Sequence, residues 1–179
     1  ASTTICAGSS VNVTFTSVPS SLNSVVAYKV NGGADQTINL TAGTATLGSG
    51  ALSANTIYSL VSVAYSDVPG CSQFIGGSAT VNVTTPVTPA VTVATDSTQI
   101  CAGSGLTFTA APTNGGSSPS YQWQLSTNAG VTWSNVGTSS STYTYSGTAN
   151  YQVRVGMTSN APCATPAATT SNTVIVNVY

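Results

Sequence analysis

Cysteine is the residue type with the most reactive chemistry in this chain, and four copies are present. They are Cys6, Cys71, Cys101 and Cys163. An even number of cysteines in a chain rich in Thr and Ser indicates disulfides formed in an oxidising compartment. A zinc site is the alternative, but no two cysteines have the short spacing that paired zinc ligands usually show.

Acid–base chemistry has almost no residues to work with. The 179 residues include two basic and three acidic side chains and no histidine. General acid–base catalysis needs histidine or paired carboxylates, and a serine nucleophile needs a base. The three aspartates, Asp35, Asp67 and Asp96, are far apart in the sequence. The sequence therefore predicts no enzyme, no catalytic residue, no metal site and no cofactor. Asp35 is the one candidate calcium ligand, and we favour the alternative that it lies in a solvated turn.

The composition also restricts the partners. A net charge of −1 gives no electrostatic footprint for nucleic acid or an anionic membrane. No apolar run approaches the roughly 18 residues of a membrane helix, so we expect no membrane insertion. The chain starts without Met or a signal peptide, and we expect either a processed chain or a segment of a longer protein.

The chain is an imperfect tandem repeat. The run Ile5–Ser9 recurs as Ile100–Ser104, and later landmarks follow in the same order in both halves. These landmarks pair Val13–Thr16 with Leu106–Thr109, Tyr28 with Trp123, Asn55–Tyr58 with Thr148–Tyr151, and Ser78–Val83 with Ser171–Val176. The proline-containing stretch Thr84–Ala90 favours a short extended linker. We therefore predict two domains, 1–86 and 87–179, and one disulfide within each, Cys6–Cys71 and Cys101–Cys163.

Each repeat has the pattern of an immunoglobulin-like sandwich. Short period-two runs rich in Val and Thr alternate with clusters of Gly, Pro, Asn and Ser. The runs are 11–16, 25–30, 36–40, 44–47, 57–65 and 79–84, and then 91–95, 106–110, 121–125, 132–136, 142–145, 151–157 and 173–178. We predict an all-β fold of two tandem immunoglobulin-like antiparallel β-sandwiches, with Tyr28 and Trp123 in the cores and Tyr58 and Tyr151 as corner tyrosines.

Four runs carry a family resemblance: Ile-Cys-Ala-Gly-Ser, 107–116, 119–124 and 157–166. They resemble the tandem immunoglobulin- or PKD-like repeats of giant Bacteroidetes surface proteins, such as gliding-motility adhesins and other type IX-secreted proteins. The likeness covers essentially all of repeat two, whereas repeat one lacks the Tyr-Gln-Trp-Gln core. The resemblance implies an exported, extracellular surface or filament component. Asp96-Ser97-Thr98 is similar to a short O-glycosylation acceptor motif in that group, which would modify Ser97; an exposed turn is the alternative.

Two surface features suggest binding. On the run 57–65 the predicted outer face is apolar at Ile57, Val61, Val63 and Tyr65, which suggests an assembly face covered by another subunit. A β-bulge that shifts the alternation is the alternative. Trp133, among polar neighbours, is a candidate glycan contact, with structural cover of a sheet edge as the alternative.

The repeats differ at their starts. Repeat two has the strand-like run Val91–Thr95 before its first cysteine, whereas repeat one has only Ala1–Ile5. We therefore predict that repeat one lacks its first strand and exposes an edge that another chain can pair. The segment that donates the missing strand would be the run Thr173–Tyr179 of another copy, an adjacent repeat, or a segment outside the chain. The expected function is a structural subunit or segment of an extracellular filament or adhesin stalk that binds copies of itself, with a glycan- or surface-polymer-binding module as the alternative.

Overall fold

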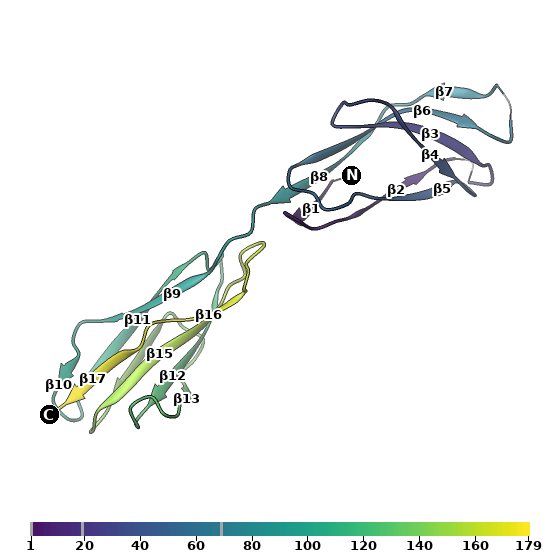
Figure 1. The fold of residues 1–179 in the computed structure, drawn as a ribbon. Coiled ribbons are helices and arrows are strands. Elements are labelled where there is room, and N and C mark those ends of the chain that lie inside the picture. The colour runs from purple at the N-terminus through teal and green to yellow at the C-terminus, as the bar shows by residue number, and fades with distance from the viewer. Residues whose placement is uncertain (1, 19, 69) are drawn as a thin grey trace. The chain divides into compact units, whose positions relative to one another are not determined.

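The computed structural model describes residues 2–18, 20–68 and 70–179, and all its regular elements there are β-strands (Figure 1). The chain divides into two compact units, Ala1–Thr85 and Pro86–Tyr179. The boundary predicted from the sequence lies one residue later. No described segment forms a helix long and apolar enough to cross a membrane. The abundance of Val and Thr explains the all-β content, because β-branched side chains pack well on pleated strands.

Unit 1 contains a large sheet and a small one (Figure 1). The large sheet has the order β1-β8-β6-β3-β4, with β7 beside β6, and the small sheet pairs β2 with β5. The first strand lies parallel to the last, and the other pairs are antiparallel. The strands are β1 (Ser2–Cys6), β2 (Asn12–Thr16), β3 (Ser24–Val30), β4 (Gln36–Leu40), β5 (Thr44–Gly48), β6 (Thr56–Tyr65), β7 (Ser72–Phe74) and β8 (Ser78–Thr84).

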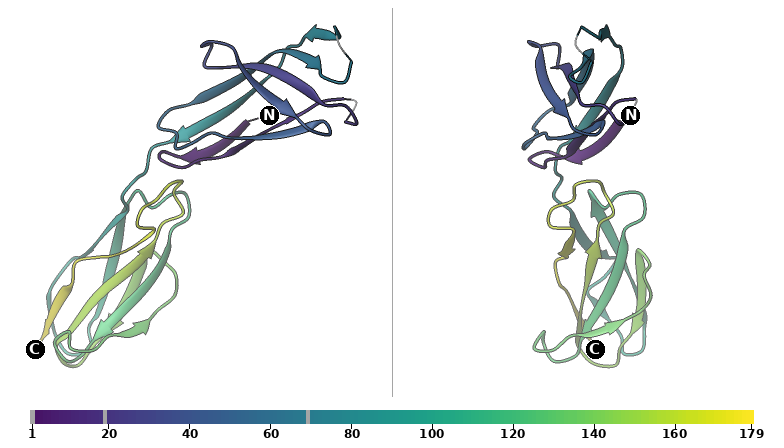
Figure 2. Two further views of the ribbon diagram at one scale, coloured as in Figure 1. Left: turned by 45° about the vertical axis from the view of Figure 1, so that its right-hand side comes forward. Right: turned by 90° about the vertical axis from the view of Figure 1, so that its right-hand side faces the viewer.

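Unit 2 repeats this topology with one strand more (Figure 2). Its large sheet has the order β10-β17-β15-β12-β13, with β16 beside β15, and its second sheet has the order β14-β11-β9. The strands are β9 (Ala90–Thr95), β10 (Gln99–Ile100), β11 (Gly105–Thr113), β12 (Ser120–Ser126), β13 (Ser134–Val136), β14 (Thr142–Ser146), β15 (Tyr151–Thr158), β16 (Ala168–Thr170) and β17 (Val174–Val178).

The topology is that of an immunoglobulin-like sandwich in both units, which confirms the predicted fold class. In each unit a short N-terminal strand pairs in parallel with the last strand, Ile5 with Val83 and Ile100 with Val178. The remaining strands form two antiparallel sheets in the Greek-key order of this fold. The sequence did not predict the strands β1, β7, β10 and β16, whose runs of two to five residues are too short to show a clear alternation.

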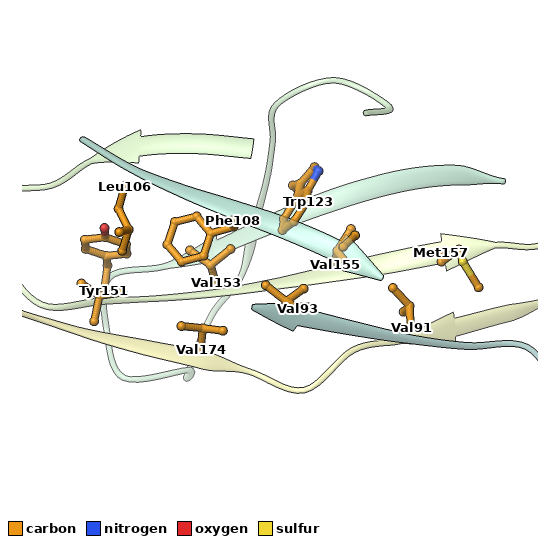
Figure 3. Packing of buried hydrophobic residues seen from close by; sticks show 12 residues of the cluster. Val91, Val93, Leu106, Phe108, Trp123, Tyr151, Val153, Val155, Met157 and Val174 are labelled. Carbon is orange, nitrogen blue, oxygen red and sulfur yellow. The ribbon is translucent and has the colours of Figure 1, made fainter. Parts of the chain in front are cut away.

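The core of unit 2 is the larger of the two. Figure 3 shows its packing, in which Trp123 and Phe108 lie among valines from β9, β15 and β17. The Trp123 ring is fully buried, and its Nε1 donates a hydrogen bond to the Ser140 carbonyl oxygen at 2.8 Å. Burying an indole is favourable only when its N–H finds such a partner. Trp123 is therefore a core aromatic, as predicted.

The core of unit 1 contains seven buried hydrophobic residues: Phe15, Val26, Tyr28, Leu40, Tyr58, Val63 and Val81. The Phe15 and Tyr28 rings pack with centroids 5.0 Å apart, so Tyr28 also takes its predicted place. Leu60 and Ile75 are packed against this core but are only partly buried. The core of unit 1 is thus shielded from solvent less completely than the core of unit 2.

A β-bulge changes the face that the second half of β6 presents. Ala27 pairs with Ser62 and the next residue of β3, Tyr28, pairs with Leu60, so Val61 has no partner on β3. The extra residue reverses the alternation, since side chains change face at every position. Val63 consequently points into the core and is only 7% exposed. The predicted outer face is wrong at Val63, and the bulge alternative is correct.

The cysteines depart from the predicted pairing. Cys71 and Cys101 are free and exposed, whereas Cys6 and Cys163 are disulfide-bonded. Cys6 ends β1 opposite Thr84, and Cys71 hydrogen-bonds to Tyr65 at the other end of β6. The ten residues of β6 span roughly 30 Å, whereas a disulfide needs Cα atoms within about 7 Å. The predicted bond Cys6–Cys71 is therefore wrong.

The same reason excludes the predicted bond in unit 2. Cys101 lies beside the end of the last strand, where Ala102 donates its N–H to the Tyr179 carbonyl oxygen. Cys163 lies at the opposite end, where its carbonyl oxygen accepts from the N–H of Val87. The eight residues of β15 separate these ends. The predicted bond Cys101–Cys163 is therefore also wrong, because matching positions in the sequence do not place two residues at the same end of a sandwich.

Candidate functional site

The main difference between the units is an open sheet edge on β2. In unit 2, β11 pairs with β14 on one side and with β9 on the other. In unit 1, β2 pairs with β5, and among residues 2–18, 20–68 and 70–179 no strand pairs with its other side. β2 also ends at Thr16, whereas β11 continues to Thr113 along the stretch that pairs with β9. The predicted lack of a first strand is therefore correct for this sheet.

The residues before Cys6 do form a strand, but on the other sheet. Ser2–Cys6 pairs in parallel with Thr80–Thr84 of β8. Its counterpart in unit 2 is β10, which pairs with β17 in the same way. β1 therefore fills the place of β10 and leaves the place of β9 open.

The backbone groups of β2 alternate between its two sides. Ser17 donates its N–H to the Gly43 carbonyl oxygen on the β5 side. Successive N–H groups along a strand point to opposite sides, so the N–H of Thr16 faces the open edge. In unit 2 the equivalent alternation holds, because Ala110 donates to Ser141 on the β14 side while Thr109 pairs with Ala94 of β9. The open edge thus presents a main-chain donor where unit 2 has a paired one.

An apolar groove runs beside this edge. It has a volume of about 270 Å³ and lies between β2 and the stretch from β6 to β8. Its apolar lining consists of Val13, Phe15, Val26, Tyr58, Leu60 and Ile75. A second groove of about 300 Å³ continues between β2, β1 and β8. No charged residue lines either groove among the described residues.

In unit 2 strand β9 covers the corresponding surface. Val91 and Val93 are each 5% exposed, and Figure 3 shows them facing Val155, Met157 and Val174. The side chain of Asn172 fixes the strand by a pair of hydrogen bonds. Its Oδ1 accepts from the N–H of Val93 at 2.8 Å, and its Nδ2 donates to the carbonyl oxygen of Val93 at 3.0 Å.

Strand registers identify the equivalent residues in unit 1. Tyr28 pairs with Leu60 where Trp123 pairs with Val155, so Leu60 takes the place of Val155. Likewise Tyr58 pairs with Ala79 where Val153 pairs with Val174, so the structure places both residues two positions away from their sequence matches, Tyr151 and Asn172. Both Leu60 and Ala79 line the groove. The floor of the groove in unit 1 is therefore the surface on which β9 lies in unit 2.

This equivalence explains the difference in burial. Val155 is 0% exposed under β9, whereas Leu60 remains half-buried. The hydrogen-bonding clamp that Asn172 provides in unit 2 is also missing. Asn172 lies two residues before Val174, and the equivalent position in unit 1, two residues before Ala79, is Gly77. Unit 1 therefore has the apolar floor and the open edge of the β9 site, without its side-chain clamp.

The predicted assembly residues do not form one surface. Ile57 is exposed, Val61 is half-buried at the bulge, and Val63 lies in the core. Tyr65 packs against the core and its hydroxyl donates to the Val18 carbonyl oxygen at 2.7 Å. No signal in the sequence marked the groove residues Leu60 and Ile75, because both are apolar residues of the kind that a closed core also contains. The short start of repeat one was the signal that pointed to this edge.

Trp133 lies immediately before β13 and is half-buried. The Arg154 guanidinium carbon is 4.0 Å from the ring centroid, and Arg154 Nε donates to Gln124 Oε1 at 2.8 Å. The indole Nε1 donates to the Gly130 carbonyl oxygen at 3.1 Å. One ring face that a sugar would need is therefore covered by the chain's own arginine.

Ser97 lies in the short turn between β9 and β10. Its hydroxyl donates to the Gln99 carbonyl oxygen at 2.8 Å and accepts from the Gln99 N–H at 3.1 Å. This closes a local turn of the kind that Ser residues often form. Modification of Ser97 stays a prediction.

The ionisable groups form no catalytic arrangement among the described residues. Lys29 and Asp35 form an exposed ion pair at 3.5 Å, and no group of three His, Cys, Asp or Glu gathers there. Burial raises the pKa of Tyr58, Tyr143 and Tyr151, and neighbouring tyrosines raise it further. Tyr58 and Tyr151 are buried core residues, and Tyr143 is partly buried and packs against the core of unit 2.

The solved structures to which the chain is similar share little sequence with it. A structure of murine CEACAM1b has 12% identity and a TM-score of 0.40, covering 98% of this chain and 96% of that one. Fibronectin(III)-like modules of Clostridium thermocellum CbhA have 17% identity and a TM-score of 0.40, covering 99% and 90%. The N-terminal four Ig domains of a Dscam1 isoform have 10% identity and a TM-score of 0.37, covering 100% and 43%.

The sequence itself identifies a family. No curated protein matches the chain. Residues 90–179 match the family described as "Domain of unknown function (DUF8696)", a stretch that corresponds to unit 2 from the first residue of β9 onward. Since that stretch is half of the chain, the protein belongs to the DUF8696 family.

Proposed function

We propose that this chain is a non-enzymatic structural module of an extracellular surface filament or adhesin stalk, and that its units join by sharing a β-strand at the open edge of β2. The observation that carries the proposal is this edge together with the apolar groove beside it. An open edge is a template for another chain, and an apolar floor gives the added strand side-chain contacts as well as main-chain hydrogen bonds.

The composition supports a non-enzymatic role. The sequence has no histidine, and its two basic and three acidic residues leave few groups for proton transfer. An immunoglobulin-like sandwich is also a fold that serves many proteins as a spacer or adhesive module. Function still depends on the site, and the open edge is the feature of this chain that favours assembly.

Two observations support an extracellular location. Cys6 and Cys163 are disulfide-bonded, and disulfides persist in oxidising compartments. The resemblance of repeat two to Bacteroidetes surface repeats implies export, by type IX secretion in that group. The proposal therefore places the protein on the cell surface, in contact with copies of itself or with adjacent repeats of a longer parent.

Electron microscopy and sedimentation of the purified native material test this role. We expect filaments or elongated oligomers whose proportion rises with protein concentration, because strand sharing is an association reaction. A chain that stays monomeric at every concentration, both alone and with its native surface fraction, contradicts the proposal.

The glycan-binding alternative has less support. Arg154 lies over the ring of Trp133, so a sugar would have to displace the guanidinium or use the other face. Titration with surface polysaccharide is the direct comparison. A saturable affinity that depends on Trp133 favours the alternative, whereas its absence together with filament formation favours assembly.

A further inference from the structure

We propose that the groove beside β2 binds an extended, uncharged segment of another polypeptide chain with the chemistry of Ala90–Thr95, lying antiparallel to β2. This inference rests on the proposed function and specifies its donor. The chain itself contains the template, because unit 2 holds such a strand on the equivalent surface.

The main-chain register follows from the template. β9 pairs antiparallel to β11, with Thr95 opposite Phe108 and Ala94 opposite Thr109. The landmark Val13–Thr16 matches Leu106–Thr109, so Phe15 stands for Phe108 and Thr16 for Thr109. A donor residue in the place of Ala94 would therefore pair with Thr16, whose N–H faces the open edge.

The side-chain requirement follows from the floor. Val93 rests against Val155 and Val174 in unit 2, and their equivalents Leu60 and Ala79 line the groove in unit 1 (Figure 3). A strand directs every second side chain to the same face, so the donor needs small aliphatic residues two positions apart. This is the pattern of Val91-Thr92-Val93.

The electrostatics require an uncharged donor. No charged side chain lines the groove among the described residues, so a charged donor residue facing the floor would be buried without a partner. A valine in that position instead removes apolar surface of Leu60 from water. The groove therefore selects against a donor with Asp or Lys in the place of Val93.

The test adds a capped synthetic peptide with the sequence of residues 88–95 to the full chain and follows amide hydrogen exchange by NMR. We expect exchange at Thr16 to slow by about tenfold or more at saturation, since a new main-chain hydrogen bond must open before exchange. Exchange at Ser17 should stay unchanged, because its N–H already bonds to Gly43. Thr109 of β11 should also stay unchanged, because β9 already pairs with it.

Two controls separate strand addition from nonspecific binding. The peptide carrying Val93→Asp should leave Thr16 exchange unchanged, and it does not affect the folding of the chain. The chain variant Thr16→Pro lacks the N–H that would bond to the donor, and an edge strand tolerates proline. Its NMR titration should therefore show weaker peptide binding at the signals of the groove residue Leu60. Equal slowing by both peptides, or no slowing by the unmodified peptide, would overturn the proposal.

Three further outcomes are distinct. Concentration-dependent protection of Thr16 in the chain alone, with faster exchange at Thr109, would mean that copies exchange β9 itself, and it would overturn the assignment of a separate donor. Filaments that leave Thr16 unprotected would contradict this inference and the strand sharing at β2, and would leave only the structural role in a filament. Peptide protection at Thr16 without any filament would contradict the proposed function and support the inference.

Discussion

At the scale of single residues, the contacts of Trp133 decide between structural cover and sugar binding. Its ring stacks under Arg154, and its indole N–H bonds to Gly130. We expect Trp133→Ala to lower the free energy of unfolding of unit 2 by about 1 kcal/mol, the size of a partly exposed cation–π contact. Trp133→Phe is the matched control, since it keeps an aromatic ring under the guanidinium. Unchanged stability in a chemical denaturation series, with loss of polysaccharide binding, would contradict the structural role.

Three tyrosine phenols, two buried and one partly buried, determine the pH dependence at the same scale. Burial, and then neighbouring tyrosines, raise the pKa of Tyr58, Tyr143 and Tyr151 above 10.0. A raised pKa in the folded state means that the unfolded chain loses its phenolic protons first. We therefore expect stability that is flat between about pH 5 and 9 and that falls as the pH rises above about 10. Denaturant unfolding at a series of pH values measures this; a loss of stability below pH 9 would show that other groups control it.

At the scale of elements, the bulge in β6 separates core from surface. Val63 is 7% exposed and Ile57 is 43% exposed, although both belong to the predicted outer face. We expect Val63→Ala to lower the free energy of unfolding of unit 1 by about 1–2 kcal/mol, because it removes buried methyl groups. Ile57→Ala is the control and should change stability by less than about 0.5 kcal/mol, as surface substitutions usually do. Equal effects from the two variants would argue against this register.

Some structural features could be predicted from the sequence and others could not, and the reasons are physical. The sequence predicts that the residues before Cys6 do not pair with the second strand, and Ser2–Cys6 pairs with β8 and not with β2. A bulge on the run 57–65 was an alternative from the sequence, but its position at Val61 was not predictable, because it depends on the pairing of β6 with β3. The predicted corner role of Tyr151 is also wrong, because its buried hydroxyl has no hydrogen-bond partner in the described part of the chain. Local pattern identifies a strand, whereas its phase across a bulge depends on the partner strand.

At the scale of the whole molecule, the cysteines show where repeat matching fails. The sequence predicts the two repeats and their fold. The end of the sandwich at which each cysteine lies depends on the direction of the strands that precede it. We expect thiol titration of the folded chain to give two reactive thiols, Cys71 and Cys101, because both are exposed and free. Peptide mapping without reduction is the check. A fragment joining Cys6 to Cys71, or a chain without reactive thiols, would contradict the structure.

In the assembled protein, a strand from another polypeptide chain should lie beside the open edge of β2. The most direct measurement is a cryo-electron microscopy reconstruction of the native filament at a resolution that separates strands, which lie about 4.8 Å apart. The proposal predicts a strand from another polypeptide chain beside β2, antiparallel to it and with aliphatic side chains against Leu60 and Ala79. A reconstruction in which the edge at Thr16 faces solvent in every subunit would contradict it.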